Sequence, residues 1–172
     1  MIRGYKVEII DSQMLSYWLK RELHIEDDVW EDRSHTPGYD AFITHICTLL
    51  ARNGIITITV SVSPDQIARI HAREQIQHFI EVYLHCPANL RQKRLQQQEL
   101  IRGIAEHMYQ PPERAELSID TSLELPERSA LHIIVYLEQY GHVAPLWEGT
   151  DTSGEEEIEL VKAHLQALGY LE

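Results

Sequence analysis

Residues 54–64 have the sequence Gly-Ile-Ile-Thr-Ile-Thr-Val-Ser-Val-Ser-Pro, and this stretch decides the fold. Ile55–Val62 is a β-branched run of strand length without a charge, which is typical of a strand covered on both faces in a parallel sheet. Gly54, just before it, suits the left-handed stop of a preceding helix. Ser61–Asp65 continues the chain as a polar loop. Because ligands bind beyond the carboxyl ends of parallel strands, this loop is the first place to look for chemistry.

Length and composition predict one globular domain. The chain has 172 residues, of which 44% are hydrophobic and 24% charged. A formal net charge of −12 argues against binding a nucleic-acid polymer, but not against a small anionic ligand in a local pocket. We expect no membrane association, because no apolar stretch approaches the length of a span and Met1–Tyr5 does not resemble a signal peptide. Cys47 and Cys86 lie in apolar patterns, which predicts reduced core thiols in a cytoplasmic protein.

The ten histidines do not indicate a metal site. No His-x-x-x-His or Cys-x-x-Cys pair occurs, so scattered core and surface histidines are the favoured interpretation.

Strand and helix patterns alternate along the chain, which predicts an α/β fold with a mainly parallel sheet flanked by helices. The expected strands are Tyr5–Ile10, Ile55–Val62, Phe79–His85 and Glu116–Thr121. The expected helices are Gln13–Leu23 with Ser12 as its cap, a short acidic helix from Glu26, Tyr39–Arg52, Asp65–His78, Ala88–Met108 and Pro126–Tyr140. We expect one domain over residues 1–140, an acidic linker over 141–157 and a C-terminal helix over 158–172.

Several segments, in order from Gly4 to Tyr140, together resemble the adenylyl-sulfate kinase family, which has the P-loop nucleoside-kinase-like fold. Gly4–Asp11 is similar to the family strand that ends in Asp-Gly-Asp, and Leu23–Arg33 is similar to its acidic turn before a substrate-binding Arg. The other similar segments are the Ser-Pro loop that ends Gly54–Pro64, the arginines Arg69 and Arg73, the run Phe79–Pro87 (FIEVYLHCP), the loop Tyr109–Pro112 (YQPP) and the run Ala115–Thr121 (AELSIDT).

The resemblance implies transfer of the ATP γ-phosphoryl group to the 3′-hydroxyl of adenylyl sulfate, with Mg²⁺. Such chemistry needs a phosphate cradle, a metal and cations. Relatives carry Gly-x-x-Gly-x-Gly-Lys-Ser/Thr before the strand matched by Tyr5–Ile10, and no Gly-x-x-x-x-Gly-Lys-Ser/Thr occurs in these 172 residues. We therefore expect a P-loop kinase-like sheet whose first strand and P-loop are missing. ATP and Mg²⁺ are expected cofactors only of an active form.

Three explanations for the missing P-loop stay open. Met1 is internal to a longer protein, or a partner supplies the front end, or the domain is degenerate and its sheet closes on itself or through a homodimer. Other motifs also depart from the family, since Asp11-Ser12-Gln13 replaces Asp-Gly-Asp. We predict a domain of sulfate activation that is inactive alone and binds a nucleotide or adenylyl sulfate at most. The alternatives are an active kinase, if a P-loop is supplied upstream or by a partner, and a regulatory or assembly domain of a sulfurylase-type complex.

The candidate site residues each have a second interpretation. Asp11 is either a metal-directed carboxylate or a helix cap. The resemblance marks candidate substrate-binding residues, which are Arg33, Ser61, Ser63, Pro64 and Arg69. Arg33 lies in an acidic stretch that favours a surface ion pair, the Ser-x-Ser-Pro loop also suits simple capping, and Arg69 with Arg73 fits a solvated helix face as well as an anion site.

Overall fold

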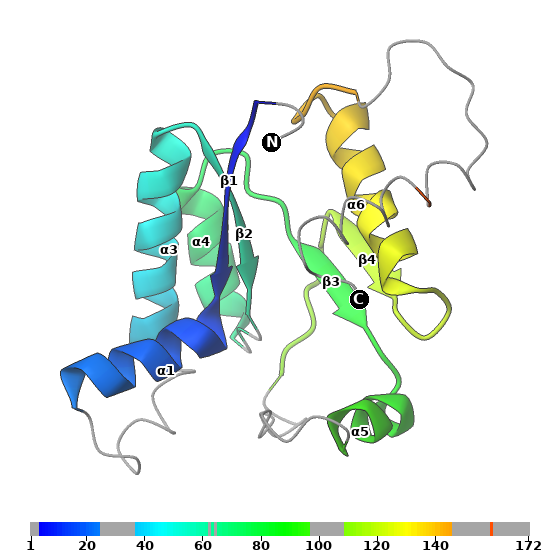
Figure 1. Cartoon of the computed structure of the whole chain (residues 1–172), viewed down its shortest axis with the longest axis horizontal. Coiled ribbons are helices and arrows are strands. Elements are labelled where there is room, and N and C mark those ends of the chain that lie inside the picture. The colour runs from blue at the N-terminus through cyan, green and yellow to red at the C-terminus, as the bar shows by residue number, and fades with distance from the viewer. Residues whose placement is uncertain are drawn as a thin grey trace. The chain divides into compact units, whose positions relative to one another are not determined.

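The computed structural model describes residues 4–24, 37–61, 63, 65–96, 109–145 and 159. The chain divides into two compact units, of which the first contains Met1–Phe79 and Arg102–Glu113 and the second contains Ile80–Ile101 and Arg114–Glu172 (Figure 1). Each unit is described by itself. Among the described residues, no helix is long and apolar enough to cross a membrane.

The first unit is built on a parallel pair of strands. β1 (Lys6–Asp11) and β2 (Ile55–Val60) pair in register from Lys6↔Ile55 to Asp11↔Val60. The chain between them includes α1 (Ser12–Leu23) and α3 (Pro37–Arg52), and α4 (Gln66–Gln75) follows β2. Gly54 has a φ of +70° where α3 ends, which confirms the predicted left-handed stop before β2.

Aspartates cap two helices of this unit, α1 and α4. Asp11 Oδ1 accepts the backbone N–H groups of Gln13 and Met14 at 2.9 and 3.1 Å, so Asp11 caps α1. The prediction of Ser12 as the cap was wrong, because Ser12 already lies in the first turn and is buried. Asp65 caps α4 in the same way, through an Oδ1 that accepts the Ile67 N–H at 2.9 Å.

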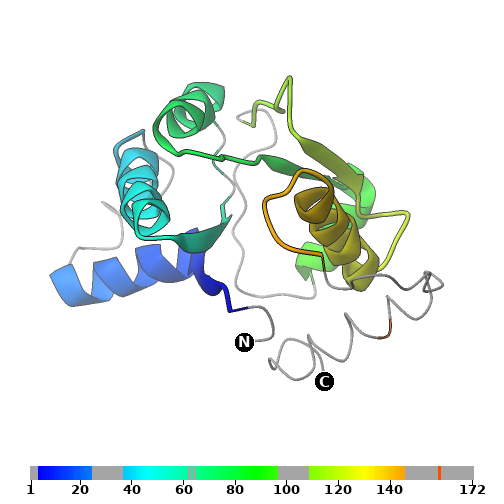
Figure 2. The ribbon, with the colours of Figure 1, turned by 90° about the horizontal axis from the view of Figure 1, so that it is seen from above.

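The core of the first unit lies between α3 and the sheet. Tyr39, Ile43 and Cys47 are buried on one face of α3, and the apolar residues packed against them are Ile10, Leu15, Leu19 and Ile76. The Tyr39 hydroxyl donates to the Ser12 carbonyl, and Cys47 Sγ lies 3.2 Å from Thr59 Oγ1. These contacts attach α3 to the start of α1 and to β2, with α4 packed beside α3 (Figures 1 and 2).

The opposite face of the β1–β2 sheet is apolar and exposed. Side chains alternate between faces along a strand, so the face away from Ile10 and Thr59 carries Val7, Ile9, Ile58 and Val60. Val7, Ile9 and Ile58 are each 48% exposed and Val60 is 56% exposed.

The second unit repeats the parallel arrangement with shorter strands. β3 (Val82–His85) pairs with β4 (Leu117–Asp120), and the register runs from Val82↔Leu117 to His85↔Asp120. α5 (Ala88–Gln96) follows β3, and α6 (Pro126–Gln139) follows β4 and lies alongside the strand pair (Figures 1 and 2). Ile119 and Leu131 are buried here.

The predicted α/β class with parallel strands flanked by helices is confirmed. The strands are shorter than expected, because β2 ends at Val60 and β3 begins at Val82. The expected acidic helix from Glu26 and the chain after Gln96 as far as Met108 lie outside the described residues. The domain boundaries at 140 and 157 stay a prediction, and the expected C-terminal helix is described only at Glu159, which is helical.

Candidate functional site

The polar loops of the first unit lie at one edge of its sheet. Since β1 and β2 are parallel and in register as far as Asp11↔Val60, Asp11 and Ser61 leave the sheet at the same end. Ser63 and Asp65 follow Ser61, so the sequence and the register together gather the predicted loop beside Asp11. Pro64 and Arg33 lie outside the described residues.

Asp11 is engaged by the backbone at this edge. Its Oδ1 accepts the two N–H groups at the start of α1, which is the capping interpretation of this residue. No group of three or more His, Cys, Asp or Glu side chains within the described ranges is arranged to hold a metal ion. We assign no metal-dependent step to these residues.

Arg69 joins the loop after β2 to a segment far along the chain. Its Nη1 donates to the Ser63 carbonyl at 2.6 Å, and its Nη2 donates to the Gln110 carbonyl. The guanidinium also lies over the Tyr109 ring, 5.6 Å from the centroid, at the distance of a cation–π contact. Ser63 has a φ of +32°, which is uncommon for a residue with a Cβ, and the bond from Arg69 helps to hold it there.

The first N–H groups of α4 are used by the chain itself. Gln66 N donates to Gln110 Oε1 at 3.1 Å, and Ile67 N donates to Asp65. Arg73, one turn beyond Arg69, lies over the Phe79 ring at 5.0 Å. Arg69 and Arg73 therefore contact separate aromatic rings, and Arg69 makes a clamp between the Ser-Pro loop and Tyr109–Gln110.

A second polar group follows the strand ends of the second unit. His85 Nδ1 lies 3.7 Å from Asp120 Oδ2, and Ser122 donates to Asp120 Oδ1 through both its hydroxyl, at 2.6 Å, and its backbone N–H, at 2.9 Å. These Ser122 bonds, and more weakly His85, hold the pKa of Asp120 below its ordinary value.

Arg94 of α5 ties this group to the helix. Its Nη1 and Nη2 donate to Thr121 Oγ1 at 3.2 Å and to the Thr121 carbonyl at 2.8 Å, and Nη1 lies 3.7 Å from Cys86 Sγ. Nothing local in the sequence foresees this contact, because Thr121 lies 27 residues beyond Arg94.

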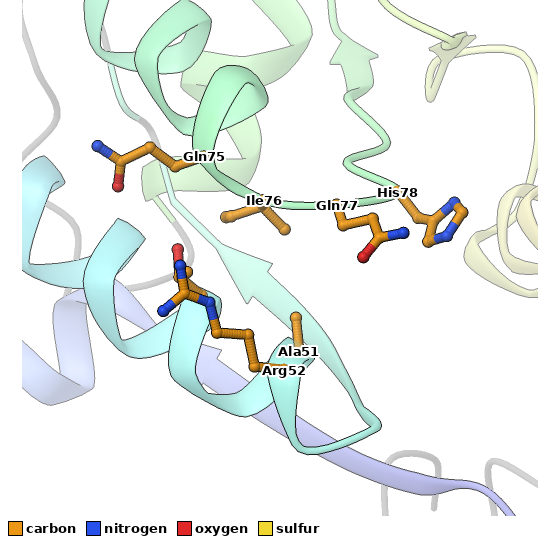
Figure 3. A pocket seen from close by; sticks show the side chains of 7 residues that line it. Ala51, Arg52, Gln75, Ile76, Gln77 and His78 are labelled. Carbon is orange, nitrogen blue, oxygen red and sulfur yellow. The ribbon is translucent and has the colours of Figure 1, made fainter.

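A shallow pocket of about 270 Å³ lies at the other end of the first unit (Figure 3). It is formed where α3 and α4 end, next to the amino end of β2, and its lining residues are Thr48, Ala51, Arg52, Gln75, Ile76, Gln77 and His78. It is thus not the pocket that the Ser-Pro loop was expected to form.

The sequence pointed to the loop after β2, but it did not show which residues that loop contacts. Tyr109 and Gln110 were noticed only as part of a family-like segment, and nothing local in the sequence pairs them with Arg69. The separation of about 40 residues is closed by tertiary folding.

The elements described so far define an α/β protein with parallel strands, flanking helices and polar loops after the strands. The family model for adenylylsulphate kinase matches residues 1–120, so the chain belongs to the adenylylsulphate kinase family.

Individual relatives agree with this assignment. The chain is 32% identical over 151 residues to an adenylyl-sulfate kinase of Halothermothrix orenii, covering 82% of this chain and 78% of the relative. It is 30% identical over 149 residues to a probable adenylyl-sulfate kinase of Pyrococcus abyssi, covering 81% and 82%. The fold is similar to that of the Mycobacterium tuberculosis APS kinase CysC, solved with AMPPNP and APS, with a TM-score of 0.59 and 23% identity over 78% of this chain and 82% of that chain.

Proposed function

We propose that residues 1–172 form an adenylyl-sulfate kinase-type domain that binds adenylyl sulfate or a nucleotide and does not transfer a phosphoryl group by itself. The observation that carries the proposal is the absence of Gly-x-x-x-x-Gly-Lys-Ser/Thr from these residues, in a chain of this family. Phosphoryl transfer is mainly positioning and charge neutralisation, and a chain without the amide cradle and its lysine lacks the means for both.

The ligand is expected at the carboxyl edge of β1 and β2. Open parallel sheets bind ligands there, and Ser61, Ser63 and Asp65 are the polar side chains that follow β2. The clamp from Arg69 supports a positioning role, because it fixes the Ser63 carbonyl and so restricts the loop. The M. tuberculosis relative, which was solved with AMPPNP and APS, supports the choice of these two ligand classes.

One alternative is favoured by a specific observation. β2 is uncharged and, among the described residues, pairs along one edge only, which is compatible with an active kinase whose phosphate-loop strand is supplied by another segment. In that case these residues provide most of the fold and the substrate side of the site.

The test is calorimetry of the full 172-residue chain with adenylyl sulfate, together with a coupled kinase assay with ATP, Mg²⁺ and adenylyl sulfate. We expect saturable binding without turnover. The double variant Ser61→Ala/Ser63→Ala should weaken binding at least about tenfold, as loss of charge-assisted hydrogen bonds predicts. Ser118→Ala, an exposed serine of β4, is the matched control and should bind like the parent chain.

Two results would contradict the proposal. Turnover at ordinary kinase rates, about 1 to 100 per second, would show that these residues suffice for catalysis. Absence of heat with both adenylyl sulfate and ATP would leave a purely structural role.

A further inference from the structure

We propose that Arg69 and Gln110 are positioning residues of the candidate ligand site, and that neither of them binds the ligand directly. They form the clamp with Tyr109, and the clamp orders the loop after β2. This changes the role of Arg69, which the sequence resemblance placed among the substrate-binding candidates. The inference rests on the proposed binding of adenylyl sulfate or a nucleotide at this loop, and it names the residues that set the geometry of the loop.

The guanidinium of Arg69 joins main-chain carbonyls of two segments that both belong to the first unit. Its Nη1 donates to the Ser63 carbonyl at 2.6 Å, and its Nη2 donates to the Gln110 carbonyl. The same planar group lies over the Tyr109 ring, 5.6 Å from the centroid. A planar fork can hold two acceptors in fixed directions, whereas the ammonium group of a lysine is a single point charge. Arg69 therefore connects the loop to residues 109 and 110 with a defined geometry.

The side chain of Gln110 makes a second connection between the same segments. Its Oε1 accepts the backbone N–H of Gln66, 3.1 Å away, at the start of α4. The next N–H of the helix, that of Ile67, donates to Asp65 Oδ1 at 2.9 Å. Gln110 is thus held by its main chain at Arg69 and by its side chain at Gln66, on either side of the end of the loop.

The position of Gln110 at the start of a helix is compatible with two opposite roles. In one role its side chain occupies the place of a ligand anion, because a helix N-terminus attracts negative charge. In the other role it holds the loop in place. Asp65 argues against the first role, since its carboxylate already accepts the adjoining N–H and would repel a second anion there. Removal of the Gln110 side chain should therefore weaken ligand binding rather than strengthen it.

The loop needs support because Ser63 has an uncommon backbone conformation. Its φ is +32°, and a residue with a Cβ keeps such a value only where the surrounding structure holds it there. The bond from Arg69 Nη1 to the Ser63 carbonyl is such a contact. Without this bond we expect Ser63 to leave the conformation, so that its hydroxyl and N–H groups would no longer have the orientation that a ligand meets.

Arg69→Lys is the first test, and Arg73→Lys is its matched control. Arg73 lies one turn further along α4 and also has its guanidinium over an aromatic ring, that of Phe79, at 5.0 Å. Calorimetry of the full 172-residue chain with adenylyl sulfate should show about tenfold weaker binding for Arg69→Lys, as the loss of charge-assisted hydrogen bonds implies. Arg73→Lys should bind like the parent chain.

Backbone dynamics test the cause without any ligand. The amide order parameters of Ser61, Ser63 and Asp65, measured by NMR relaxation, should fall in Arg69→Lys from near the rigid value of about 0.85 to below about 0.6. They should stay near the rigid value in Arg73→Lys. Urea denaturation of both variants checks that the difference between them is not a difference in global stability.

Two changes of Gln110 test the side-chain part of the clamp. Gln110→Ala removes the acceptor of the Gln66 N–H, so it should speed hydrogen exchange of this amide and weaken adenylyl sulfate binding, each by about threefold. Gln110→Glu keeps an acceptor and should restore the slow exchange. The double variant Arg69→Lys/Gln110→Ala should bind little more weakly than Arg69→Lys, because both changes release the same loop.

Several results would overturn the proposal. Unchanged order parameters in Arg69→Lys would show that the clamp does not order the loop, and equal losses of binding in Arg69→Lys and Arg73→Lys would indicate an anion site made by both arginines. Tighter binding by Gln110→Ala would mean that its side chain occupies a ligand position. Additive losses in the double variant would assign Arg69 to direct contact with the ligand.

Failure of the proposed function is distinguishable from failure of this inference. A parent chain that binds neither adenylyl sulfate nor ATP contradicts the proposed function. The order parameters and the exchange of the Gln66 amide are measured without ligand, so they still decide whether the clamp orders the loop.

Discussion

The two faces of the β1–β2 sheet come from alternate residues of the same strands, but they differ in their surroundings. On one face, Ile10 and Thr59 pack against buried residues of α3, and on the other, Ile9 and Ile58 are each 48% exposed. The covered face is the less apolar of the two. The difference shows that apolar sequence alone does not bury a residue, because burial also needs an element placed over it.

The largest expected effect on stability is seen by comparing two isoleucines, one buried against the covered face of the sheet and one on the exposed face. Ile43→Ala removes a buried side chain of α3 and should lower the free energy of unfolding by about 3 kcal/mol, through lost burial and a residual cavity. Ile58→Ala should lower it by about 1 kcal/mol or less, since the side chain is half exposed. Urea denaturation of both variants measures the difference. Equal losses would mean that the outer face is covered in solution.

The covered side should also be sensitive to high pH. Burial, and then the charges of Asp11 and Asp40, raise the pKa of Tyr39 to about 12 from its ordinary value near 10. The unfolded chain therefore loses this proton first, so the stability present below pH 10 is lost progressively up to about pH 12. The two-unit difference corresponds to about 2 to 3 kcal/mol.

Tyr39→Phe tests the cause of this pH dependence. The variant loses the hydroxyl that donates to the Ser12 carbonyl, which should cost about 1 kcal/mol near neutral pH. Its free energy of unfolding should then fall less steeply than that of the parent between pH 10 and 12. An unchanged slope in denaturation curves would show that other groups cause the loss.

A smaller effect on stability is expected at the carboxyl ends of β1 and β2, where the helix caps lie. Asp11→Ala and Asp65→Ala each remove a helix cap, and each should cost about 1 kcal/mol in urea denaturation. Asp11 is next to the covered core, and Asp65 begins α4, which has no buried residue. If Asp11→Ala alone cost much more than about 1 kcal/mol, Asp11 would contribute to the packing of the core as well as to the capping of α1.

The smallest expected effect on stability lies in the second unit. It concerns an exposed polar group, which should contribute little to the free energy of unfolding, as is expected of the exposed face of the first sheet. Ser122 is the main cause of the lowered pKa of Asp120. Ser122→Ala should raise this pKa toward the ordinary aspartate value, measured by NMR titration, with little change in stability near pH 7. A pKa that stays low would assign the effect to the backbone N–H of residue 122, which the variant keeps, and to His85 rather than to the Ser122 hydroxyl.

The sequence predicted the elements well where the evidence was local. The uncharged run after Gly54 forms β2, the glycine has the positive φ that a left-handed stop needs, and Pro126 begins α6 as expected. Apolar residue type is less successful at identifying the core. Phe42 and Ile43 are neighbouring apolar residues of α3, but only Ile43 is buried and Phe42 is exposed. The period defines a face, and the neighbouring elements decide how much of that face is covered.

The candidate site shows the same limit. Chain order and strand polarity were enough to place Ser61, Ser63 and Asp65 at the carboxyl edge, near Asp11. The role of Arg69 was not accessible, because its partners at Tyr109 and Gln110 lie about 40 residues away and share no local pattern with it. The predictions for Arg33 and Pro64 stay predictions, since both lie outside the described residues.

The sequence by itself determined the family, the α/β alternation and the uncharged strand β2, since motifs, periodicity and charge are properties of neighbouring residues. Tertiary structure alone decided that Arg69 clamps a distant loop and that the more apolar face of the first sheet is exposed. These outcomes depend on which segments meet in space. A hydrogen bond or a buried surface needs two partners, and a local sequence pattern identifies only one of them.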